Sequence, residues 1–137
     1  MNQTTPALTS AEALMTVAVL AMDADDCYDL LEMERLRAMT WLHPLFKNID
    51  SADRFIGQRF SDLRGRGRGV VLEDAARALN SDLRETAFAW AVELVYADGA
   101  VVSKEHVFLD RLARRFDIPG PLARKIRAVT AIRRRAV

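Results

Sequence analysis

The clearest indication of the fold is in residues 81–109, which read SDLRETAFAWAVELVYADGAVVSKEHVFL. The first half of this stretch is apolar almost all round, which is typical of a helix buried in a protein core. The Asp-Gly pair at 98–99 predicts a turn. Ser103 and Glu105 then predict the start of another helix, because serine caps helices and an acidic side chain favours the first turn. The stretch therefore predicts a helical hairpin whose buried first helix spans about 81–97.

The same pattern occurs earlier in the chain. A shift of 73 positions aligns residues 11–36 with residues 84–109, with seven identities. Each copy has an apolar helix, then Ala-Asp, then a glutamate seven residues after that aspartate. We therefore expect two helical hairpins, at about 11–45 and 84–118, packed around a pseudo-twofold axis.

Capping and breaking signals place the other helices. Thr9 with Glu12, and Asp29 with Glu32, fit capping boxes. Pro44 predicts that the second helix stops near residue 43, because the residue before a proline avoids the helical conformation. The remaining signals predict a helix at about 51–63 capped by Ser51, a Gly-rich loop at 64–69 and a short helix at 70–79. They then predict a helix capped by Ser81 and another from Ser103 to near Phe116. The last predicted helix has Pro121 in its first turn and ends near Ile132.

Length and composition bound the architecture. A chain of 137 residues with 50% hydrophobic and 28% charged residues is typical of one globular domain. No alternating strand pattern is visible, so we expect an all-α domain of about seven helices. The expected layout is a flexible leader at 1–9, the helical domain at 10–132 and a basic tail at 133–137. Trp41 and Trp90 fall at helical spacing and are expected in the core.

Net charge and the length of the apolar segments also limit the classes of partner and the cellular compartment that we expect. A formal net charge of +1 argues against nucleic acid as a partner. The longest apolar run, at about 13–22, is too short to cross a membrane. With no signal peptide evident, we expect a cytoplasmic protein, and a position at the inner membrane face stays open.

Two segments resemble a known family. Residues 97–105, ADGAVVSKE, following a long apolar helix, resemble the signature of the TerB-like tellurite-resistance family, which is related to the N-terminal domain of the co-chaperone DjlA. Residues 24–26 with Glu32 resemble its degenerate partner motif, with Asp26 where the second copy has Gly99. The resemblance implies an all-helical domain with an internal dyad and a role in bacterial stress responses. It also implies metal binding by acidic residues and protein partners in a stress-response or membrane-associated complex; a homodimer stays open.

The acidic residues of the two loops form a candidate metal site. Carboxylates seven residues apart on either side of a tight loop can converge on one point. The predicted ligands are Asp25, Glu32, Asp98 and Glu105, with Asp26, Asp29 and His106 as additional candidates. Oxygen ligands suit Ca²⁺, Mg²⁺ or Mn²⁺. The alternative is structural: Asp98 accepts backbone N–H bonds in its turn, and Glu105 lies in the first helical turn, where it satisfies the helix dipole.

Two arginine clusters are candidate contacts to anions or partners. They are Arg64, Arg66 and Arg68 in the Gly-rich segment and Arg133, Arg134 and Arg135 in the tail. A solvated loop and a charged helix end are the structural alternatives.

These observations favour a non-enzymatic stress-response module that binds a divalent cation and protein partners. No nucleophile–base pair can be recognised in the sequence. Two alternatives stay open: a small helical hydrolase with a carboxylate–metal site, and a structural adaptor without an ion.

Overall fold

The computed structural model describes residues 7–23, 30–97 and 101–135. The regular elements in these residues are all helical, which confirms the all-α prediction. They comprise α1 (Ser10–Asp23), α2 (Leu30–Leu42), the short 3₁₀ helix η1 (Pro44–Phe46), α3 (Ala52–Arg66), α4 (Arg68–Ala78), α5 (Ser81–Tyr96), α6 (Ser103–Arg115) and α7 (Gly120–Arg133). None of these helices is long and apolar enough to cross a membrane.

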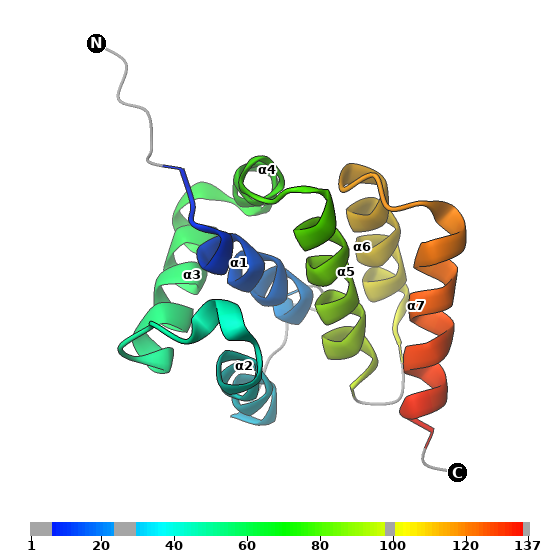
Figure 1. Cartoon of the computed structure of the whole chain (residues 1–137), viewed down its shortest axis with the longest axis horizontal. Coiled ribbons are helices and arrows are strands. Elements are labelled where there is room, and N and C mark those ends of the chain that lie inside the picture. The colour runs from blue at the N-terminus through cyan, green and yellow to red at the C-terminus, as the bar shows by residue number, and fades with distance from the viewer. Residues whose placement is uncertain (1–6, 24–29, 98–100, 136–137) are drawn as a thin grey trace.

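The centre of the fold is the pair α1 and α5. Every residue of α1 from 13 to 22 is buried, because α3, α4 and α5 all pack against this helix. In Figure 1, α1 lies between α3 and α5, and α6 and α7 lie on the other side of α5. The two helices that the 73-residue shift pairs therefore contact each other. The pseudo-twofold axis itself stays a prediction.

Several of the predicted helix ends are confirmed. The Thr9 N–H donates to Glu12 Oε1 at 2.9 Å, and the Glu12 N–H donates to Thr9 Oγ1 at 3.1 Å, so the capping box of α1 is complete. The Arg54 N–H donates to Ser51 Oγ at 3.2 Å at the start of α3. Helix α2 ends at Leu42, just before the predicted stop.

Two predicted caps are wrong by one residue. Asn80, not Ser81, caps α5, and its Oδ1 accepts a first-turn backbone N–H at 2.9 Å. Asparagine caps helices at least as well as serine, so the first of two adjacent good caps is used. Val102, not Ser103, precedes α6, because the Val102 N–H donates to Glu105 Oε1 at 3.0 Å and this bond draws Ser103 into the first turn.

The predicted Gly-rich loop at 64–69 is wrong. Helix α3 continues to Arg66 and α4 starts at Arg68, so Gly67 alone separates them. Gly67 has φ 91° and ψ 157°, a backbone conformation that essentially only glycine adopts. Its N–H donates back to α3 and its carbonyl accepts the first bond of α4.

The prediction that Trp41 belongs to the core is also wrong. Trp41 has 85% of its surface exposed to solvent, whereas Leu36 and Met39 of the same helix are fully buried. At 3.6 residues per turn, Trp41 lies about 140° around the helix from Leu36, so it points away from the core. Trp90 is half-buried and packs against the core.

Candidate functional site

A pocket lies where α2, α5 and α7 meet. Its volume is about 400 Å³, within the range of ligand sites. We call it the α2–α7 pocket and define it by the residues that line it: Arg35, Ala38, Met39, Leu42, Ala89, Trp90, Glu93, Leu94, Ala97, Thr130, Arg133 and Arg134.

Most of this lining is apolar. Met39 and Leu94 are buried beneath the pocket, and Trp90 is half-buried beside them. Leu42 stands on the rim, and 73% of its surface is exposed. Together with neighbouring Trp41, it leaves a large apolar surface in water at the end of α2, a feature that often marks an interaction site.

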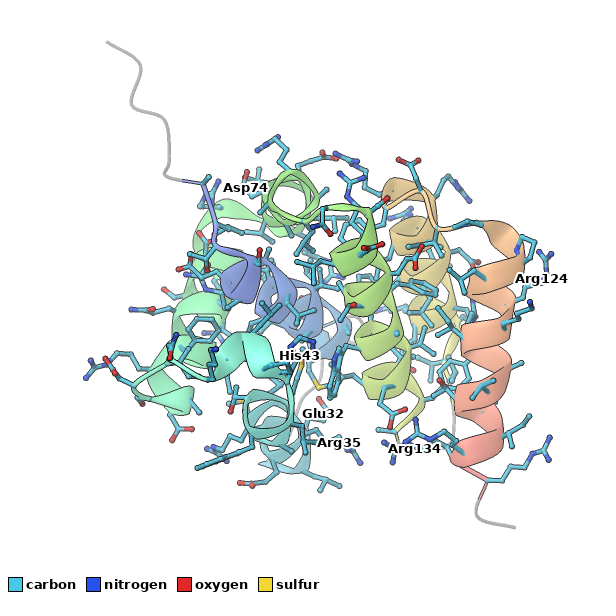
Figure 2. The ribbon with its side chains drawn as sticks, in the orientation of Figure 1. Glu32, Arg35, His43, Asp74, Arg124 and Arg134 are labelled. Carbon is cyan, nitrogen blue, oxygen red and sulfur yellow. The ribbon has the colours of Figure 1, made fainter. Side chains whose placement is uncertain are left out.

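Charged side chains flank the apolar part. Glu93 of α5 is largely buried and pairs with Arg134, while its Oε2 lies 3.6 Å from Arg133 Nη1. Arg35 comes from α2 and Arg134 follows the end of α7, and Figure 2 shows both near the lower end of α5. The described lining thus holds three arginines and one glutamate, an excess of positive charge.

The structure places the predicted tail arginines individually. Arg133 is the last residue of α7, and with Arg134 it is held over α5 by Glu93. Arg135 is exposed beyond the end of α7. Two of the three predicted basic residues therefore belong to the α2–α7 pocket.

A second pocket lies between the end of α1, the start of α4 and α6. Its volume is about 520 Å³. We call it the α1–α6 pocket, defined by its lining residues Leu20, Asp23, Arg68, Gly69, Leu72, Ser103, Lys104, Val107, Phe108, Arg111 and Leu112. Arg68 Nη1 lies 2.6 Å from Asp23 Oδ2, and the Arg68 guanidinium lies 5.8 Å from the centre of the Phe108 ring.

Of the other two arginines of the Gly-rich segment, Arg66 joins two helices and Arg64 contacts its own helix. Arg66 Nη1 lies 3.2 Å from Asp62 Oδ1, and the same guanidinium bonds to Asp74 of α4. The hydrogen bond to Asp74 raises the pKa of Arg66. The Arg64 guanidinium lies 5.8 Å from the centre of the Phe60 ring. Arg66 thus ties α3 to α4, a role that the prediction of an anion contact did not include.

The candidate metal ligands are described only in part. Asp25, Asp26, Asp29 and Asp98 lie outside the described residues. Glu32 and Glu105 occupy the first turns of α2 and α6, the position that the structural alternative gives Glu105. Glu105 also accepts the Val102 N–H.

His106 has a side-chain partner. Its Nδ1 lies 2.6 Å from Arg127 Nη2, and because arginine only donates, this ring nitrogen accepts. No group of three or more histidine, cysteine, aspartate or glutamate residues in the described ranges is placed to hold a metal ion. The metal site stays a prediction.

Sequence reasoning missed Arg35, Leu42 and Glu93. One signal was present for Glu93, which is the single charged residue between 87 and 96. A carboxylate in an otherwise apolar helix requires a paired cation, because burial of an unpaired charge is costly. No protein-family model, curated protein or solved structure matches this chain.

Proposed function

We propose that this chain is a non-enzymatic helical module that binds an acidic, amphipathic helix of a partner protein in the α2–α7 pocket. The observation that carries this proposal is the combination, in one pocket, of an apolar lining and arginines on opposite walls. A helix docks in such a groove by burying apolar side chains spaced along one face.

The charge of the pocket selects the partner. Arg133 and Arg134 share one carboxylate, Glu93, so the pocket keeps a positive excess that complements carboxylates on a ligand. Complementary charge steers association and discriminates against basic ligands. The exposed Leu42 on the rim supplies apolar surface for the same partner to cover.

A pair of designed peptides tests the proposal. Each is a helix of about 15 residues with leucines on one face, flanked by glutamates in one peptide and by lysines in the other. We expect the glutamate peptide to bind the full chain and to change its tryptophan fluorescence, and the lysine peptide to bind at least about tenfold more weakly. Equal binding of both peptides contradicts the charge argument.

Matched variants locate the binding site. Leu42→Glu places a carboxylate on the rim and should weaken binding of the glutamate peptide to the α2–α7 pocket at least about tenfold. Leu31→Glu is the control, because Leu31 is exposed on the same helix and lines neither pocket. Equal binding by the two variants would overturn the assignment of this pocket.

A second copy of the chain is the competing occupant. Sedimentation velocity of the full chain without peptide distinguishes it. A dimer that Leu42→Glu dissociates would show that another copy covers the pocket and would overturn the proposal of a separate partner. A monomer at all concentrations supports it.

We propose separately, from the resemblance to the TerB-like family, that the chain acts in a stress response and that its acidic loops bind a divalent cation. Close carboxylates repel one another when no cation neutralises them, so removing the cation should destabilise the fold. We expect EDTA to lower the melting temperature and Ca²⁺, Mg²⁺ or Mn²⁺ to restore it. Asp98→Asn should abolish this response, whereas Asp82→Asn, in the first turn of α5, should keep it. A melt unchanged by EDTA and by each cation contradicts the proposal.

A further inference from the structure

The two pockets have the same chemical plan. Each has an apolar lining flanked by three basic residues and one carboxylate among the described residues. In each, an arginine pairs with that carboxylate: Arg68 with Asp23 in the α1–α6 pocket, and Arg134 with Glu93 in the α2–α7 pocket. No described residue lines both pockets, so the two linings are separate.

The internal repeat relates the walls of the two pockets. Positions of α2 that line one pocket correspond, at the shift of 73, to positions of α6 that line the other: Arg35 with Phe108, Ala38 with Arg111, and Met39 with Leu112. The same shift relates Leu20 of α1 to Glu93 of α5, which also line the two pockets. Equivalent faces of the two copies therefore form the two pockets.

The third wall of each pocket comes from a helix outside this correspondence. Helix α4 closes the α1–α6 pocket and α7 closes the α2–α7 pocket. Arg68, the first residue of α4, pairs with the carboxylate of one pocket, and Arg134, which directly follows α7, pairs with the carboxylate of the other. The arginine–carboxylate pair that the two pockets have in common thus includes residues outside the repeated segments.

We propose that the chain is bivalent, and that the α1–α6 pocket binds a second acidic, amphipathic helix of the kind proposed for the α2–α7 pocket. This inference rests on the proposed function. Two sites of one kind let a single chain join two partner molecules, or hold two segments of one partner with increased avidity. Val107, which is 48% exposed, is the exposed apolar residue in the lining of the α1–α6 pocket, as Leu42 is in the other pocket, although the shift of 73 does not relate these two positions.

Calorimetric titration of the full chain with the glutamate peptide tests the stoichiometry. We expect two peptides per chain for the natural sequence and one for either Leu42→Glu or Val107→Glu. The double variant should bind none. Val129→Glu is the control, because Val129 is 56% exposed on α7 and lines neither pocket, and it should still bind two. Circular dichroism verifies that each variant is folded.

The outcomes separate the two proposals. One peptide per chain, with Val107→Glu unchanged, would overturn bivalency and leave the α2–α7 pocket as the binding site. Two peptides bound by Val107→Glu would also overturn it, because the second site would then lie elsewhere. No binding by the natural sequence would overturn the proposed function and bivalency together.

Discussion

The substitution Gly67→Ala tests how α3 and α4 are joined. Gly67 has φ 91° and ψ 157°, and a side chain in this region costs about 1–3 kcal/mol. A Cβ added there would meet no atom within 4 Å, so steric clashes contribute nothing and the backbone strain is the whole cost. At about 3–5 °C per kcal/mol for a chain of this size, the melting temperature should fall by several degrees.

Gly57→Ala is the matched control. Gly57 lies inside α3, its φ is not positive, and a Cβ there also meets nothing within 4 Å. Alanine should therefore stabilise the helix by about 0.5–1 kcal/mol. Urea titration with an unchanged dependence on denaturant measures both effects. If Gly67→Ala is as stable as the natural sequence, or if both substitutions destabilise equally, the one-residue break between α3 and α4 is refuted.

Two further predictions concern buried charge. The Arg59 side chain is only 10% exposed, and its Nη2 lies 3.8 Å from Glu12 Oε2. Glu12→Gln keeps the cap acceptor but removes the charge that faces Arg59, so the free energy of unfolding should fall by about 1–3 kcal/mol. In an Arg59→Met background the same change should cost much less, and additive costs in a double-mutant cycle would refute the coupling. Burial lowers the pKa of His43 from its ordinary 6.5. Just below pH 6.5, the unfolded chain therefore binds more protons than the folded chain. The stability of the fold consequently decreases as the pH falls through this range. His43→Asn keeps an acceptor for the Leu45 N–H, and its melting temperature should vary less between about pH 5 and pH 7.5; parallel curves would exclude His43 as the cause.

The candidate site was predictable only in fragments. The basic character of Arg133 and Arg134 was visible in the sequence, but their pairing with Glu93 was not, since that glutamate lies about 40 residues away and on another helix. Arg68 was grouped with Arg66 because the two are neighbours in sequence. The structure separates them, because Gly67 turns the chain and sends Arg68 to Asp23.

Local interactions in the sequence specify most of the helices. Apolar periodicity and the caps at Thr9 and Ser51 specify helices through interactions within one or two turns, so they can be seen in a short window. Which helix faces stay exposed and which charges meet depends on how the helices pack. Trp41 is exposed and Glu93 is paired because of how α2, α5 and α7 pack together, and that packing depends on residues far apart in the chain.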